Sequence, residues 1–84
     1  MNATDDMLKR ETGKWLGKIE AETKNIKAVG NPAKKHLENM NAYVSDSRHF
    51  LEKKDFIRAF ECVVWAWSIY ELCVELKIFE KTKE

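Results

Sequence analysis

The sequence has few of the residues that end helices or form tight turns. Only 3 glycines and 1 proline occur among its 84 residues. Sheets need many turns, and turns depend on these residues, so their scarcity favours a few long helices. The hydrophobic fraction of 44% is too high for a disordered chain, because that much apolar surface can offset the entropy lost on folding. We therefore expect a single helical domain over residues 1–84.

The sequence also lacks an excess of charge of one sign and a long apolar run. The formal net charge is +1, which gives no overall attraction to nucleic acid or to an anionic membrane. The longest apolar run, Cys62–Trp67, is too short to cross a bilayer, and the first ten residues lack the apolar segment of a signal peptide. Cys62 and Cys73 would lie roughly 16 Å apart on one helix, beyond disulfide reach. These features predict a cytoplasmic protein with free thiols and no membrane partner.

Two breaks divide the chain into three predicted helices. At Gly30-Asn31-Pro32, the glycine suits a left-handed helix end, the asparagine suits an N-cap and the proline suits the first helical position. Asp55 suits an N-cap before the apolar run that starts at Phe56. We predict helices over residues 5–28, 32–52 and 56–79, with frayed ends at residues 1–3 and 81–84. Short connections make successive helices antiparallel, so the predicted fold is all-α, an up-down-up three-helix bundle.

The third predicted helix has two apolar faces. The expected core face contains Phe56, Ala59, Phe60, Val63, Ala66, Trp67, Tyr70, Cys73 and Val74. A second stripe, with the spacing of a heptad seam, contains Cys62, Trp65, Ile69, Leu72, Leu76 and Phe79. The other two helices could cover this stripe if the third helix is central. If they leave it in water, it would form an apolar patch typical of a partner surface.

The second stripe leads to our first functional hypothesis, a non-enzymatic protein-interaction module. The partner would be a second copy of the chain, giving a homodimer, or a helix of another protein. Trp65, Ile69, Leu72 and Leu76 would be its main contacts.

The bend between the first two helices is basic. Lys24, Lys27, Lys34, Lys35 and His36 surround the start of the second helix, and no acidic residue occurs between Glu22 and Glu38. Free N–H groups at a helix start favour an anion, so the second hypothesis is weak binding of phosphate or an RNA backbone. No aromatic residue here could stack on a base, and we rank nucleic acid below a protein partner. His36 lies on the flank of the core stripe and is predicted to be partly buried.

One group of polar residues has the spacing of a catalytic or metal site. Asp46, His49 and Glu52 follow one another at intervals of three residues on the second helix. His49, however, lies opposite the core stripe, so we interpret the group as a solvated surface. The sequence shows no activated nucleophile, phosphate-binding loop or paired metal motif. We therefore predict no enzymatic activity, no metal and no cofactor.

The last two helices resemble a known family. The matching residues are Tyr43, Asp46-Ser47, the run from Phe50 to Asp55, Ala59-Phe60-Glu61 and Trp65-Ala66. Over Tyr43–Phe79 this pattern is similar to a small archaeal family defined only as domain of unknown function 357. Lys54 stands where that pattern has a turn glycine, and Ser47 stands where it has alanine. The resemblance implies a three-helix bundle and implies no activity.

Overall fold

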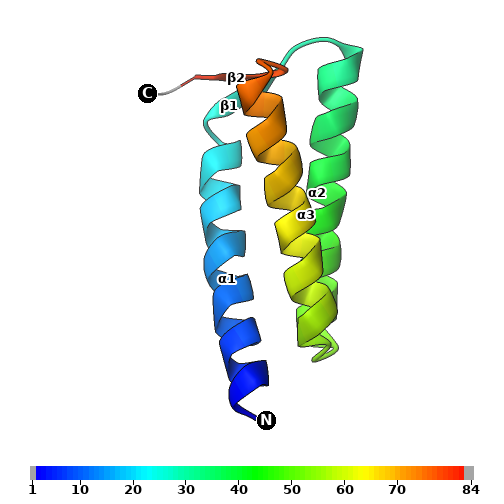
Figure 1. Cartoon of the computed structure of the whole chain (residues 1–84). Coiled ribbons are helices and arrows are strands. Elements are labelled where there is room, and N and C mark those ends of the chain that lie inside the picture. The colour runs from blue at the N-terminus through cyan, green and yellow to red at the C-terminus, as the bar shows by residue number, and fades with distance from the viewer. Residues whose placement is uncertain (1, 83–84) are drawn as a thin grey trace.

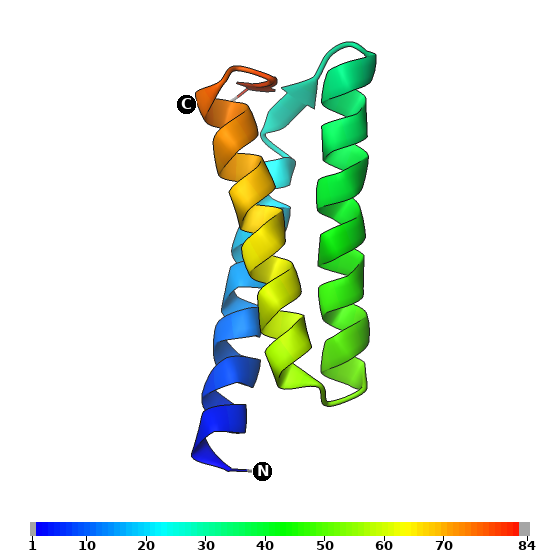
Figure 2. The same ribbon diagram turned by 45° about the vertical axis from the view of Figure 1, so that its right-hand side comes forward.

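The computed structural model describes residues 2–82 and contains three long helices. α1 spans Ala3–Thr23, α2 spans Asn31–Glu52 and α3 spans Phe56–Glu75. The helices run up, down and up, with α3 beside both α1 and α2 (Figures 1 and 2). The prediction of an antiparallel three-helix bundle is confirmed. Met1, Lys83 and Glu84, which belong to the predicted frayed ends, lie outside the described residues.

α3 is the central helix of a flat molecule. α1 and α2 each pack along α3 and make little contact with each other, and the principal extents are 43 × 24 × 17 Å. Small residues allow the close packing of α2 on α3: Ser47 and Ala59 are both fully buried, and the Ser47 hydroxyl donates to the Ala59 carbonyl at 2.7 Å. Because α3 has a neighbour on each of two sides only, its remaining side faces solvent.

Two short strands close one end of the bundle. β1 spans Ile26–Ala28 and pairs antiparallel with β2, Phe79–Lys81; Ala28 lies opposite Phe79. Thr82 extends the pairing, because its N–H donates to the Asn25 carbonyl at 2.8 Å. The strand pair lies across the end of the bundle at which α1 ends (Figure 1).

The strands correct three predictions about the ends of elements. α1 ends at Thr23 rather than at residue 28, and α3 ends at Glu75 rather than at residue 79. Lys81, predicted to fray, is held in β2. At the other end, the Asn2 side chain accepts a hydrogen bond from the Asp5 N–H at 2.7 Å, so Ala3 is helical rather than frayed.

α2 and α3 end in the same backbone motif. The residue after each helix cap has a left-handed conformation, with φ of 61° at Lys54 and 60° at Lys77. The next N–H then reaches back to the helix: Asp55 donates to the Phe50 carbonyl and Ile78 to the Cys73 carbonyl. Lys77 therefore stops α3 and redirects the chain into β2.

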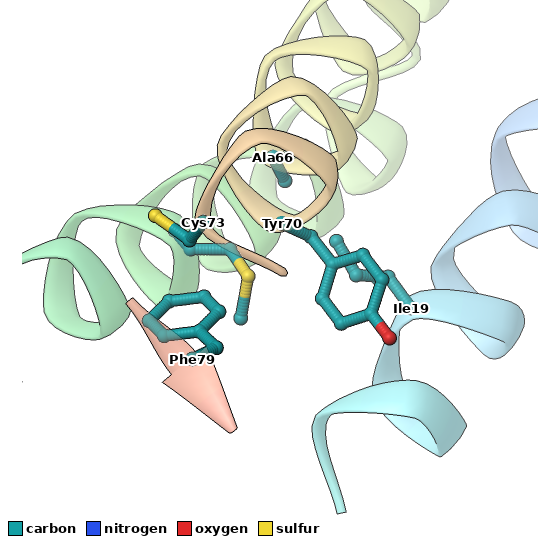
Figure 3. Close-up of a cluster of buried hydrophobic side chains, with 6 residues drawn as sticks. Ile19, Ala66, Tyr70, Cys73 and Phe79 are labelled. Atoms are coloured by element: carbon teal, nitrogen blue, oxygen red, sulfur yellow. The ribbon is translucent and has the colours of Figure 1, made fainter. Parts of the chain in front are cut away.

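The buried core is concentrated beside the two strands. Ile19, Met40, Ala66, Tyr70, Cys73 and Phe79 form one cluster of buried side chains (Figure 3). The Tyr70 hydroxyl donates to a Glu22 carboxylate oxygen at 3.0 Å, which joins α3 to α1. Burial, and then the hydrogen bond and charge of Glu22, raise the pKa of Tyr70 to about 12.

Candidate protein-interaction surface on α3

Next to its contact with α2, α3 carries a row of apolar side chains, three of which are exposed. Trp65, Leu72 and Leu76 are 58%, 54% and 60% exposed, and Cys62 and Ile69 beside them are half-buried. We call these five residues the α3 ridge. Their spacing along the chain is 3-4-3-4, so they form one continuous row on the helix. Central placement of α3 thus leaves much of the second stripe uncovered.

Phe79, the last residue predicted for this stripe, does not belong to it. Its side chain is 2% exposed and packs in the core cluster, on β2 (Figure 3). The reason is the chain reversal at Lys77, which carries the following residues back over the end of the bundle. The apolar row therefore ends at Leu76, the C-cap of α3.

An aromatic contact from α2 supports the ridge. The rings of Tyr43 and Trp65 are stacked, with centroids 6.3 Å apart and planes 21° apart. Both side chains line a shallow groove between α2 and α3, together with Phe50 and Cys62. Sequence reasoning missed this contact, although the signal was present: Tyr43 and Phe50 are seven residues apart on the flank of α2.

The ridge has an acidic border. Glu61, Ser68 and Glu75 are exposed, and their spacing of seven residues makes a row parallel to the ridge. Between Ala59 and Leu76 the sequence has no lysine or arginine. At the start of α3, Arg58 lies 3.6 Å from an Asp55 carboxylate oxygen and over the Phe50 ring.

The negative charge beside the ridge affects the pKa of the Cys62 thiol. Burial raises its pKa, and the nearby carboxylates of Asp46, Glu61 and Asp55 raise it further. The thiol therefore stays protonated at neutral pH and is a poor nucleophile. Its contribution to the surface is apolar contact.

A second apolar groove runs along the other side of α3, against α1. Trp15, Phe60, Val64 and Trp67 line it. The Trp67 indole donates to the Trp15 carbonyl at 3.0 Å, and the two rings meet edge to face. The groove volume of about 230 Å³ is below the range of small-molecule sites. A side chain from a partner surface fits in this volume.

The structure gathers the predicted basic bend at the end of the bundle that carries the strands. Lys24 caps α1, Lys27 lies on β1, and Lys34 and Lys35 lie in the first two turns of α2; all are exposed. His36, predicted to be partly buried, is also exposed. Lys27 has Glu80 opposite it in the strand pair, which offsets part of the positive charge.

The predicted polar group on α2 does not converge on a site. Asp46, His49 and Glu52 are all exposed, and the His49 ring packs on Phe50. Among residues 2–82, no three metal-ligating side chains lie close enough to hold an ion. The same residues include no helix that is long and apolar enough to cross a membrane.

Comparison with known proteins places the chain in a family. A family model described as a protein of unknown function (DUF357) matches residues 10–79. The chain belongs to the DUF357 family. The crystal structure of a DUF357 protein from Archaeoglobus fulgidus is similar in fold, with a TM-score of 0.86 and 46% sequence identity. The match covers 95% of this chain and 100% of the other, and no curated protein matches. The predicted resemblance to an archaeal DUF357 family is confirmed, and the match extends over most of α1 as well.

Proposed function

We propose that this DUF357 protein is a non-enzymatic interaction module that binds an α-helix of a protein partner through the α3 ridge. The observation that carries the proposal is the exposure of Trp65, Leu72 and Leu76, each more than half open to solvent, in one heptad row. Single exposed apolar residues are ordinary on protein surfaces. A contiguous row that includes a tryptophan is typical of a partner surface.

The ridge suits a helical partner because of its shape. Residues at heptad spacing insert between the side chains of a facing helix as knobs into holes. The grooves on either side of the ridge, one lined by Tyr43 and one by Trp15, offer space for side chains of that helix. Since Trp65 already rests on Tyr43 and α3 is packed on two sides, binding would order little of the module.

The two thiols support the non-enzymatic part of the proposal. Burial raises the pKa of Cys73, as it does that of Cys62, so neither is an activated nucleophile. Both cysteines are free, which fits our placement of the module in the reducing cytoplasm.

The basic bend supports a second candidate function, weak binding of a phosphate or an RNA backbone. α2 starts without a side-chain cap and without an acidic residue in its first turn, which leaves its positive end open to an anion. Replacing Lys34 and Lys35 by glutamate should abolish the retention of a short single-stranded RNA in filter binding. Unchanged retention would exclude this function.

The proposed ridge function is tested with a helical peptide probe and a solution mass. The probe has leucines at heptad spacing and glutamines at the flanking positions, and light scattering on a sizing column measures the mass of the protein alone. We expect either a complex with the probe or a dimer, lost in Trp65→Glu. Val29→Glu is the matched control, because Val29 is 64% exposed and lies outside the ridge. A wild-type monomer that binds no heptad peptide would contradict the proposal.

A further inference from the structure

We infer that the helix bound by the α3 ridge is a basic amphipathic helix of another protein, rather than a second copy of this chain. This inference rests on the proposed function and adds the chemical class of the partner. It is drawn from the charges that border the ridge.

The border of the ridge attracts positive charge along most of its length. Glu61 and Glu75 lie in the row next to the ridge, and Glu71 lies beside the groove toward α1; all three are exposed. None of them has an ion-pair partner among residues 2–82. On the α2 side of the ridge, Asp46 adds to the negative potential at Cys62. A helix packed here would therefore meet carboxylates on both of its flanks.

On α3 itself, the basic residues nearest the ridge lie only at its ends, whereas Lys14 and Lys18 of α1 lie over the Trp15 ring, which lines the groove toward α1. Arg58 pairs with Asp55 at 3.6 Å, and its guanidinium lies over Phe50. Lys77 follows the helix cap at the other end. Charge complementarity thus points to a partner with an apolar seam and flanking lysines or arginines.

The same charges oppose a second copy on the ridge. In an antiparallel pair of α3 helices, the row of Glu61, Ser68 and Glu75 would face the identical row of the other chain. In a parallel pair, this row would face the side of α3 that carries Ala66 and Cys73 and that packs against α2. The first arrangement sets like charges against each other, and the second gives the carboxylates no cation.

The spacing of the carboxylates defines the partner further. Glu61 and Glu75 are fourteen residues apart, or roughly 21 Å along the helix axis. The partner should therefore present basic residues about four turns apart on one flank of an apolar seam.

The test uses three labelled helical peptides of about 21 residues, long enough to span the carboxylates. They share one leucine seam and differ only in carrying lysine, glutamine or glutamate at the flanking positions. Binding to the full chain is measured by fluorescence anisotropy at low salt. We expect the lysine peptide to bind at least about tenfold more tightly than the glutamate peptide, and this difference to shrink at about 0.5 M salt.

Charge-reversed variants supply the control. Glu61→Lys with Glu75→Lys should reverse the order of the lysine and glutamate peptides. Glu38→Lys with Glu52→Lys changes the net charge equally, on exposed positions of α2, and should leave the order unchanged. The order of affinities could stay unchanged when Glu61 and Glu75 are replaced, or reverse when Glu38 and Glu52 are replaced. Either result would show that the carboxylates beside the ridge do not select the partner, and would overturn the inference.

The outcomes separate this inference from the proposed function. Equal affinity for all three peptides would overturn the basic partner and leave helix binding intact. A dimer of the chain alone, lost in Trp65→Glu, would also overturn it and would identify the second copy as the occupant. No binding of any peptide by a monomeric chain would overturn both.

Discussion

The indole of Trp65 lies nearly parallel to the phenol ring of Tyr43, and this pair joins the exposed ridge of α3 to the flank of α2. The stack fixes the orientation of a tryptophan that is 58% exposed. Such a side chain would otherwise sample several rotamers and lose that freedom on binding. The contact therefore prepares the largest residue of the ridge for a partner.

The Tyr43–Trp65 stack predicts a measurable coupling between the two residues. Tyr43→Ala, Trp65→Ala and the double variant should give a coupling free energy of about 0.5–1 kcal/mol in urea unfolding. Each single variant should lower stability by only about 1–2 kcal/mol, because both side chains remain partly in water. Additive effects of the two substitutions would show that the rings do not interact in solution.

Phe79 and Leu76 provide a matched test of where α3 ends. Phe79→Ala should lower the free energy of unfolding by about 3–5 kcal/mol, because it leaves a cavity in the core cluster. Leu76→Ala, at a side chain that is 60% exposed, should change it by less than about 0.5 kcal/mol. Thermal or urea denaturation of both variants measures the difference. A neutral Phe79→Ala would instead place Phe79 on the exposed stripe, as in an α3 that continues beyond it.

We predict that glycine in place of Lys54, the left-handed residue between α2 and α3, stabilises the protein. Lys54 has a φ of 61°, where a side chain collides with the backbone, so Lys54→Gly should stabilise the fold by about 0.5–1 kcal/mol. Lys53 is the control, because its φ of −81° suits any residue and Lys53→Gly should destabilise. The midpoints of urea unfolding measure both shifts. A loss of stability in Lys54→Gly would contradict the assigned backbone conformation.

Two fully buried hydroxyl groups should respond in opposite ways to their removal. The Thr12 hydroxyl has no hydrogen-bond partner among the residues that the structure describes, whereas the Ser47 hydroxyl donates to the Ala59 carbonyl. Thr12→Val keeps the shape and should stabilise by about 1 kcal/mol. Ser47→Ala should destabilise by about 1 kcal/mol. Denaturant unfolding measures both changes. If Thr12→Val and Ser47→Ala changed the free energy of unfolding in the same direction, the two hydroxyl groups would not differ in hydrogen bonding.

Tyr70 predicts a loss of stability at high pH. Its pKa is raised from 10.0 to about 12 in the folded chain, so the folded state holds the phenolic proton more tightly than the unfolded state does. This stabilisation is complete below pH 10 and is lost as pH rises from 10 through 12, by at most about 2–3 kcal/mol. Tyr70→Phe should unfold with a shallower dependence over this window. If wild type and Tyr70→Phe lost the same free energy of unfolding between pH 10 and pH 12, Tyr70 would have no part in that loss.

The helices and their core faces could be predicted because periodicity and capping residues act locally. Gly30, Pro32 and Asp55 mark breaks that the structure keeps, and Ala59, Val63, Ala66 and Tyr70 are buried as the stripe indicates. The predicted N-cap at Asn31 is wrong, because Gly30 occupies that position and Asn31 is the first residue of α2. The sequence left open whether the other helices would cover the second stripe. In the structure Trp65, Leu72 and Leu76 are exposed because α1 and α2 pack on two sides of α3 only. Their role in binding stays a prediction.

The strand pair could not be predicted because nothing local marks it. Ile26 continues the apolar stripe of α1, and Phe79 continues the heptad of the second stripe, so both resemble further helical turns. No glycine or proline follows Thr23 or Glu75 at once. After the cap of α3, Lys77 takes a left-handed conformation, which is favourable only because β2 then pairs with β1 and Phe79 enters the core. That gain depends on residues more than fifty positions apart.

Binding of a basic helix at the α3 ridge can be observed directly by mapping the lysine-flanked helical peptide onto the chain by nuclear magnetic resonance. Backbone and indole N–H shifts are followed as the peptide is added. We expect the largest changes at Trp65, Ile69, Leu72 and Leu76, with smaller ones at Tyr43, Glu61, Ser68 and Glu75. Changes confined to α1 or to the basic bend, or no changes at all, would contradict binding at the ridge.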